Sequence, residues 1–296
     1  MSGCIVVGYT ATDAGMDAVA LGSRLAAASG AQLELVLILP SGSRSVITPP
    51  DAGYDRYLND QAAKWLADAV AAVPDGVAHA THIRYGDSFA DGLMTAANDL
   101  GASHIVIGTA GDGRRGRHRL GTVANTLLHS AEVPVVLAPE GSRGTNPLIG
   151  ITRITAAVGT RPGAGTLMGE ALSLATVTGA KLRLLSLVTV DLPPSVDTGV
   201  IEIAGAAHAS NVLSTARKSL PADISSEVVV ARGTSIEDAV QHLSWEPGEI
   251  AMVGSSRLAT PRRLFIGSTA AKMLHELPVP MIVVPRTQNT SEGTQR

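Results

Sequence analysis

Aromatic residues make up only 3% of this 296-residue chain, so Val, Leu, Ile and Ala must fill any core that it forms. The single cysteine, Cys4, excludes a disulfide within the chain, and its apolar neighbours favour a small buried strand residue over a reactive thiol. No apolar run approaches the roughly 18 residues of a membrane-spanning helix, and no signal-peptide pattern opens the chain. These absences predict a cytoplasmic protein without membrane contact.

Charge and histidine placement exclude two further classes of function. The formal net charge of −3 gives no basis for nucleic-acid binding. None of the eight histidines pairs with another at metal-ligand spacing on one helix face, and His79 and His82 fall on opposite faces of an expected strand. We therefore expect neither a nucleic-acid partner nor a metal site built from protein side chains.

Motifs for fast catalysis are missing as well. The nucleophile pattern G-x-S-x-G does not occur, and the phosphate loop G-x-x-x-x-G-K-[S/T] is also absent because no lysine lies in 108–122. No acidic residue stands out as a holder of Mg²⁺ for phosphoryl transfer. The sequence therefore predicts a protein that is not an enzyme.

Glycine, by contrast, is abundant and patterned. An apolar run at 105–107 leads into a glycine-punctuated loop, a short apolar-periodic segment and a second apolar run at 134–137. Gly108, Gly111 and Gly121-Thr122 complete the pattern G-x-x-G-(x9)-G-[S/T]. Glycine lets the backbone approach an anion, and the N–H groups of a first helical turn point toward it. The pattern predicts a phosphate-holding loop; a structural turn whose glycines only satisfy positive φ is the alternative.

The chain contains this arrangement twice. A constant spacing near half the chain length indicates two tandem copies of one small domain. We place the copies at 1–140 and 148–286, joined by a linker rich in Gly, Ser and Thr and followed by a polar tail at 287–296 that we expect to be disordered. The second copy has Arg257 in place of Gly111. Corresponding landmarks lie 146 residues apart: Gly108 and Gly254, Gly121 and Gly267, Pro134 and Pro280, Pro139 and Pro285.

Buried apolar runs alternate with helix-period segments in both copies. This alternation predicts an α/β fold with parallel strands and right-handed crossovers. One helix is expected to begin after Gly86, with Asp87 or Ser88 as its N-cap. Expected strands are 4–8, 33–39, 77–85, 103–107 and 134–138 in the first copy, and 154–158, 182–188, 226–231, 250–253 and 280–284 in the second.

Several longer motifs point to a family. They are "IVIGTAG", "YGDSFADGLMTAANDLGASHIVIG" and "GTVANTLLHSAEVPVVLAP" with its echo "GSTAAKMLHELPVPMIVVP". On these motifs the chain resembles the universal stress protein family, in its tandem form, over nearly its whole length. The resemblance implies two doubly wound five-stranded parallel sheets of order 3-2-1-4-5, Rossmann-like and adenine nucleotide alpha hydrolase-like. It also implies pairing of the halves through their fifth strands, 135–138 against 282–284; a homodimer and an unidentified protein partner are further expectations.

In that strand order, the switch point lies between strands one and four, so the loops at 8–13 and 108–121 form the crevice. The resemblance implies that ATP, accompanied by Mg²⁺, binds there in some members. The glycines would wrap the phosphates, and the start of the following helix would present N–H groups and a hydroxyl. The residues that match are Gly8, Thr10, Gly108, Gly111, Gly121, Thr122 and Val123.

Two departures weaken this site. Family members that bind ATP usually carry an aspartate just after strand one, whereas alignment through Val7-Gly8 puts Thr10 there and Arg161 in the second copy. A neutral hydroxyl replaces one hydrogen bond but not a charge-assisted one, which is stronger. Arg257 in the second copy occupies space that the phosphate loop keeps open. We therefore expect ATP in the first copy and a scaffold role for the second.

Other prominent residues have simpler interpretations. The basic run formed by Arg114, Arg115, Arg117, His118 and Arg119 is interpreted as a solvated loop, with phosphate neutralisation or an acidic partner as the alternative. Trp65 and Trp245 are expected at helical positions as packing residues.

Three functions follow from these features. The leading hypothesis is a non-enzymatic stress-response regulator that binds ATP in its first half, with at most very slow ATP hydrolysis. The second is an interaction module with both sites degenerate, which Thr10, Arg161 and Arg257 favour. The third is an adenylyl-transferring enzyme of the related α/β superfamily, against which the lack of an obvious catalytic acid or lysine argues.

Overall fold

The structure is a computed structural model that describes residues 3–41, 52–109, 118, 120–146, 148–159, 164–189, 199–218, 220–221, 224–255 and 266–285. The chain divides into two compact units, Met1–Leu127 with Val135–Gly150, and Leu128–Pro134 with Ile151–Arg296. Helices and parallel strands alternate along the chain in both. The predicted α/β class with parallel sheets is confirmed.

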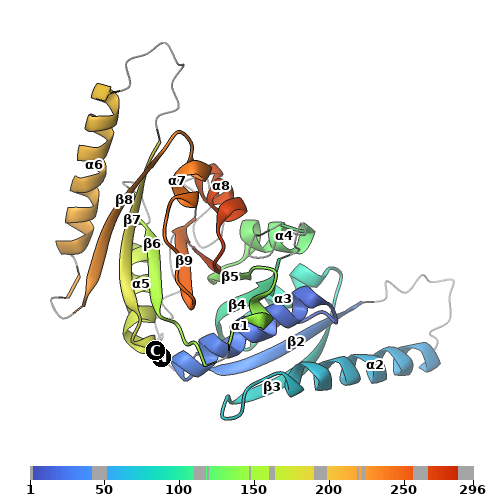
Figure 1. Ribbon diagram of the computed structural model, residues 1–296. Helices are drawn as coiled ribbons and strands as arrows, with labels where there is room; N and C mark the ends of the chain where they lie inside the picture. Colours follow the sequence, from blue (N-terminus) through green and yellow to red (C-terminus); the bar gives the residue numbers. More distant parts are fainter. Residues whose placement is uncertain are drawn as a thin grey trace, which may run out of the picture. The chain divides into compact units, whose positions relative to one another are not determined.

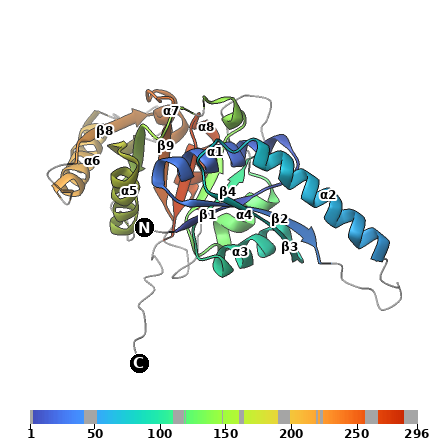
Figure 2. The same cartoon turned by 90° about the horizontal axis from the view of Figure 1, so that it is seen from below.

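The first unit is a parallel sheet with helices on both faces (Figure 1). Figure 2 shows α1 and α2 on one face and α3 and α4 on the other. The strand order is β3-β2-β1-β4-β5, which is the order that the resemblance implies. Its elements are β1 (Cys4–Gly8), α1 (Asp13–Ser29), β2 (Gln32–Pro40), α2 (Ala52–Ala71), β3 (His79–Gly86), α3 (Phe89–Asp99), β4 (Ala102–Gly108), α4 (Thr122–Ser130), β5 (Val135–Ala138) and the short 3₁₀ helix η1 (Ser142–Gly144).

The second unit repeats this plan. Its strands follow the order β10-β9-β6-β7-β8, again with parallel neighbours, and Figure 2 shows α5 and α6 on the opposite side of the strands from α7 and α8. Its elements are β6 (Arg153–Ala157), α5 (Ala164–Thr178), β7 (Lys181–Thr189), α6 (Gly199–Lys218), β8 (Ser226–Gly233), α7 (Ile236–Gln241), β9 (Glu249–Gly254), α8 (Ser268–Glu276) and β10 (Met281–Val284).

The strand register shows how the copies correspond. Val7 pairs with Val106 in the first unit, and Ala156 pairs with Met252 in the second. Because Val106 and Met252 lie 146 residues apart, like the glycine landmarks, Val7 corresponds to Ala156. The offset is therefore 149 residues (156 minus 7) at the first strand, and it falls to 146 by the fourth strand.

This register corrects one residue of the sequence alignment. Counting onward from the first strands, Thr10 corresponds to Gly159, and Arg161 corresponds to Thr12. The alignment that placed Arg161 at the position of Thr10 is wrong by two residues, because it matched the dipeptide Val-Gly rather than the strand partners. The second unit thus has no side chain where the first has the Thr10 hydroxyl.

Hydroxyl side chains cap helices in both units. Ser88 accepts from the Asp91 N–H at 3.1 Å, and Ser235 accepts from the Asp238 N–H at the same distance. Each satisfies one of the N–H groups that a first helical turn leaves without a partner. Of the two predicted caps for α3, Ser88 is therefore the one used.

A buried ion network crosses three strands of the second unit. The Glu249 carboxylate on β9 has no solvent exposure; it accepts from Arg153 on β6 at 2.7 Å and from Arg183 on β7 at 2.6 Å. Thr155 donates its hydroxyl proton to the same carboxylate and accepts from Arg183 Nε at 2.8 Å. The apolar strand pattern did not predict this network.

Further groups complete the network. The Ser244 carbonyl accepts from both guanidinium groups, at 3.1 Å from Arg153 and 2.9 Å from Arg183. Trp245 lies after α7, not within a helix as predicted, and its ring is 4.8 Å from the Arg183 guanidinium carbon. Burial lowers the pKa of Arg183, and the Glu249 charge acts against this. Both arginines stay charged because the intrinsic pKa of arginine is far above neutrality.

The first unit has different side chains at these positions. Cys4 and Glu34 correspond to Arg153 and Arg183, and the Glu34 carboxylate lies 2.7 Å from His82 Nε2. Cys4 is half-buried rather than buried, and its thiol donates to the Leu100 carbonyl at 3.3 Å. Burial, followed by the Glu34 charge, raises the pKa of this thiol, which disfavours the reactive thiolate.

Trp65 also differs from its prediction as a packing residue, since 37% of it is exposed on α2. Among the described residues, no helix is both long and apolar enough to cross a membrane. The same described residues contain no group of three or more His, Cys, Asp or Glu side chains suited to hold a metal ion.

Hydrogen bonds to Asp17 hold the segment after β5 against α1. This carboxylate is 1% exposed and accepts from the backbone N–H of Gly141 at 3.0 Å and of Arg143 at 2.8 Å. The Arg143 guanidinium also lies 2.7 Å from the Asp13 carboxylate. The predicted linker therefore begins with a turn that packs on the first helix.

We expect Asp17→Ala to lower the free energy of unfolding by about 1.5–3 kcal/mol, because two backbone donors lose a charged acceptor. Urea unfolding followed by circular dichroism measures this loss. Asp13→Ala is the control: its carboxylate is 86% exposed, so its removal should cost no more than about 1 kcal/mol. Equal effects of the two substitutions would contradict the assignment.

Candidate functional site

The candidate site lies at the switch point of the first sheet. β1 and β4 are neighbours, and β2 and β5 lie on their outer sides. The crossovers after β1 and β4 therefore leave the sheet in opposite directions, which opens a crevice at the carboxyl ends of these two strands. Gly8 is the last residue of β1 and Gly108 is the last residue of β4.

Close packing explains both of these glycines. A Cβ atom on Gly108 would lie 1.8 Å from the backbone oxygen of Ala14, in the first turn of α1. A Cβ on Gly8 would lie 2.6 Å from the Leu93 side chain of α3. Neither glycine has positive φ. Gly108 thus lets α1 approach β4, a role that the sequence did not reveal.

The β1–α1 loop is a tight turn that positions Thr10. The Thr10 hydroxyl lies 2.9 Å from the Thr12 hydroxyl, which accepts from the Gly15 N–H at 3.2 Å and so caps α1. A Cβ on Gly15 would lie 1.8 Å from the Thr10 carbonyl oxygen, so this turn requires glycine. Thr10 is half-buried at the crevice. It offers a neutral hydroxyl where we expect an aspartate in family members that bind ATP.

Gly121, Thr122 and Val123 form the start of α4. The Gly121 carbonyl accepts from the Asn125 N–H at 3.0 Å, which makes Gly121 the N-cap, and both Gly121 and Thr122 are exposed. The first N–H groups of a helix have no partner within it and favour anions. A Cβ on Gly121 would meet nothing within 4 Å, and its φ is not positive. Glycine is one of the residues preferred at an N-cap, but packing against the described residues does not require it here.

The sequence pattern did not predict that His118 is buried, because this residue lies within the basic run. The interpretation of that run as a solvated loop is wrong for His118, which is 2% exposed. Its Nδ1 lies 3.3 Å from the Thr109 hydroxyl, which itself donates to the Ala138 carbonyl at 3.0 Å. Since that hydroxyl proton is already used, Nδ1–H of His118 is the donor. His118 thereby ties the end of the loop to the ends of β4 and β5.

The remaining predicted residues lie outside the described part of the chain. These are Gly111, Arg114, Arg115, Arg117 and Arg119 in the first copy and Arg161 and Arg257 in the second. Within the described residues, no hydrogen bond joins Thr10 to Gly121–Val123. What the fold brings to one edge is thus Gly8, Thr10 and Gly108, with the start of α4 following β4.

The chain belongs to the universal stress protein family, whose family model matches residues 1–139 and again 150–285. Two of its relatives are universal stress protein Rv2319c of Mycobacterium tuberculosis (strain ATCC 25618 / H37Rv) and universal stress protein Mb2346c of Mycobacterium bovis (strain ATCC BAA-935 / AF2122/97). Each is 29% identical over 297 residues, covering 95% of this chain and 99% of the relative. The match is consistent with a tandem form.

Solved structures share the fold. A universal stress protein from Archaeoglobus fulgidus DSM 4304 has a TM-score of 0.61 at 14% identity, covering 96% of this chain and 98% of its own. A putative universal stress protein from Pseudomonas aeruginosa UCBPP-PA14 has a TM-score of 0.58 at 18% identity, covering 95% and 92%. At these identities the likeness extends to the fold alone.

Proposed function

We propose that this protein is a non-enzymatic stress-response regulator that binds ATP in its first half. The observation that carries the proposal is Gly121. An exposed helix start whose first N–H groups have no partner among the described residues, with an open Cβ position, offers room and donors for an anion, and described packing does not require glycine there. The neighbouring Thr122 adds a hydroxyl, and Val123 adds a further N–H group.

The other predicted residues would complete the site. Gly8 and Thr10 would line the nucleoside side of the crevice, with the Thr10 hydroxyl in place of the family's aspartate. Gly111 would keep the phosphate side open, and Gly108 would place α1 close to the end of β4 beside it. ATP would enter as its magnesium complex, with the metal held mainly by phosphate oxygens and water. The start of α4 fits such a group, because a side chain at Gly121 would fill the space that a phosphate needs.

Binding without turnover is part of the proposal. No lysine lies in 108–122 to stabilise a transferring phosphate. Occupancy would instead favour those loop conformations that contact the nucleotide, and a partner that distinguishes these conformations would sense it. This regulatory role would be exercised in the cytoplasm.

We expect wild-type protein to bind MgATP in calorimetric titration and Gly121→Val to weaken binding by about tenfold or more, since roughly 1.4 kcal/mol of phosphate contact is lost. Gly267→Val makes the matched change at the N-cap of α8 in the second half and should leave the affinity unchanged. Thermal unfolding of both variants confirms that they fold. No binding by wild type at millimolar MgATP would remove ATP from the proposal.

A second candidate is an interaction module that binds no nucleotide. Its support is that Gly108 and Gly8 have packing roles and that the Thr10 hydroxyl already bonds Thr12. It predicts that Gly111→Arg, which copies Arg257 of the second half, leaves function intact. The ATP-binding proposal predicts that this substitution abolishes MgATP binding.

We also propose that the halves pair through their fifth strands and that the chain forms homodimers. Within its own unit, each of β5 and β10 is the last strand of the sheet, and an unpaired edge invites association. An edge strand leaves every second N–H group unpaired, so hydrogen exchange that is slow at all residues of Val135–Ala138 would support pairing. Analytical ultracentrifugation tests the homodimer.

A further inference from the structure

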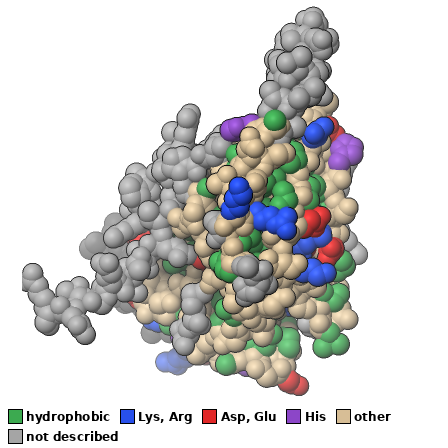
Figure 3. All heavy atoms as spheres, turned by 90° about the vertical axis from the view of Figure 1, so that its left-hand side faces the viewer, with side chains coloured by type: hydrophobic (Ala, Val, Ile, Leu, Met, Phe, Trp, Pro, Cys, Tyr) green, Lys and Arg blue, Asp and Glu red, His purple; other side chains and the backbone are tan. Residues whose placement is uncertain are grey.

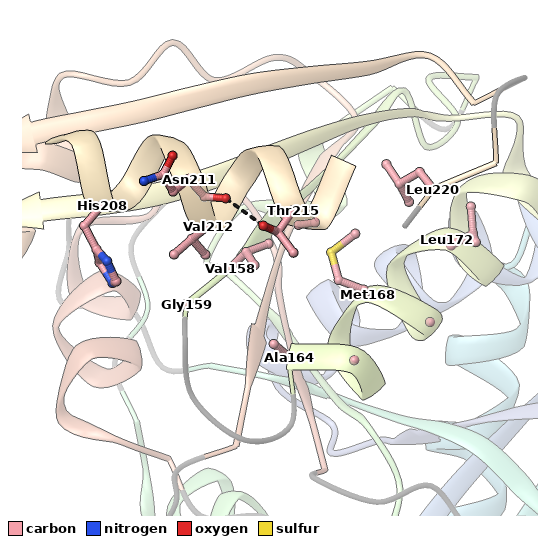
Figure 4. A pocket seen from close by; sticks show the side chains of 13 residues that line it. Val158, Gly159, Ala164, Met168, Leu172, His208, Asn211, Val212, Thr215 and Leu220 are labelled. Atoms are coloured by element: carbon pink, nitrogen blue, oxygen red, sulfur yellow. Dashed lines mark hydrogen bonds between the residues drawn. The ribbon is translucent and has the colours of Figure 1, made fainter. Parts of the chain in front are cut away.

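The second unit contains a pocket that is separate from the candidate nucleotide site. It lies between α5 and α6 beside the end of β6 and has a volume of about 710 Å³, within the range of small-molecule sites. Figure 4 shows its side chains converging from the two helices. Its described lining consists of Val158, Gly159, Ala164, Gly165, Met168, Gly169, Leu172, His208, Asn211, Val212, Thr215, Ala216 and Leu220.

The two ends of the pocket differ in chemistry. Met168, Leu172 and Leu220 gather at one end, and His208 and Asn211 lie at the other (Figure 4). Thr215 adds little as a donor, because its hydroxyl donates to the Asn211 backbone carbonyl at 3.0 Å. The described part of the lining contains no Asp, Glu, Lys or Arg side chain. The pocket thus offers an apolar body and a polar end with imidazole and amide groups.

Two glycines leave open space on the face of α5 that lines the pocket. Gly165 and Gly169 are one helical turn apart, and a Cβ atom on either would meet nothing within 4 Å. Neither has positive φ, so the backbone does not require glycine. Glycine within a helix costs about 0.5–1 kcal/mol relative to alanine. Packing against the described residues does not explain this cost, and the missing side chains leave open space beside Met168 and Leu172.

We propose that this pocket binds a single-chain amphiphile, a molecule with one alkyl chain and one hydrogen-bonding end such as a medium-chain fatty acid or alcohol. The lining of α5 extends from Ala164 to Leu172, about 12 Å along the helix axis. An alkyl chain would lie along this length on Met168 and Leu172. Its polar end would accept from the His208 ring and the Asn211 amide. The described lining offers no arginine or lysine to the phosphates of a nucleoside triphosphate, and it therefore favours an uncharged or singly charged ligand.

Calorimetric titration of the full chain with decanoate and with decanol, both below their aggregation concentrations, tests this proposal. We expect both to bind. Gly169→Leu, which fills the pocket, should weaken both by tenfold or more, and Gly169→Ala should change them less than twofold. If the pocket prefers a carboxylate, His208→Ala should weaken the binding of decanoate by about fivefold and that of decanol less. If a hydroxyl serves equally well, His208→Ala should weaken the binding of both ligands by the same factor. Either result supports the amphiphile site.

Three outcomes overturn the proposal: no binding of either probe by wild type, unchanged binding by Gly169→Leu, or displacement of decanoate by ATP. If Gly169→Leu does not fold, Val212→Asp replaces it, because a carboxylate inside the apolar part should repel decanoate. The Gly121→Val variant should bind decanoate like wild type. The amphiphile site and the proposed ATP site can therefore fail independently.

Discussion

Glu249→Ala is expected to lower the free energy of unfolding of the second unit by about 3–5 kcal/mol, because it leaves two buried guanidinium groups without their shared carboxylate. Arg153 and Arg183 each donate to Glu249, and Arg183 is 3% exposed. Trp245 stacks on Arg183, so its fluorescence reports this unit directly. Urea unfolding in a Trp65→Phe background, with Trp245 as the only tryptophan, is the measurement.

Glu246→Ala is the matched control. Glu246 also pairs with Arg153, at 2.5 Å, but its side chain is 47% exposed, so water replaces the lost partner. Its removal should cost no more than about 1 kcal/mol. A loss for Glu249→Ala as small as this would show that the network is not the stabilising centre of the unit.

Gly108→Ala is expected to destabilise the first unit by about 3 kcal/mol or more, at the upper end of overpacking substitutions. The added methyl would lie 1.8 Å from the Ala14 carbonyl oxygen and 2.4 Å from its carbon, and backbone atoms cannot rotate away as a flexible side chain can. The first turn of α1 must therefore shift. Native-state hydrogen exchange of α1 measures the loss, with β7 of the second unit as an internal reference.

The duplication supplies a control at the corresponding position. A Cβ on Gly254, at the end of β9, would meet only the Leu167 Cβ at 4.0 Å, which is ordinary contact distance. Gly254→Ala should therefore change stability by less than about 0.5 kcal/mol, as expected away from packed features. If both substitutions proved equally harmless, close approach of α1 to β4 would not be the reason for Gly108.

The same pair shows how the copies have diverged. The sequence retains glycine at both strand ends and suggests that the second copy closed its crevice through Arg257. At the described strand end the first unit is the tighter one, since α1 touches Gly108 while the space around Gly254 stays open. The same glycine at corresponding positions of the two copies therefore has different structural roles, and only its distance to the neighbouring helix distinguishes them.

One face of the molecule shows how the charged side chains are distributed. On the face shown in Figure 3, acidic and basic side chains lie close together rather than in blocks of one sign. This distribution fits the small formal net charge of −3.

The candidate site was predictable in part. Gly121 and Thr122 were found because a helix start with glycine and a hydroxyl residue is a local pattern, read within a few residues of sequence. The packing role of Gly108 was not, because its contact is with Ala14, almost a hundred residues earlier. His118 was misread for the same reason: its partner Thr109 and the Ala138 carbonyl meet only when β4 and β5 pair.

By itself the sequence determined the duplication and the alternation of strands and helices, and it narrowed the cap of α3 to two residues, because repeats, hydrophobic period and capping residues act over short stretches of chain. The tertiary structure alone decided which polar side chains share a buried centre. Arg153, Arg183 and Glu249 come from three strands and meet because the sheet order places β6 between β7 and β9. No local pattern encodes that meeting, since the energy of a buried charge depends on the partner across the sheet rather than on its neighbours along the chain.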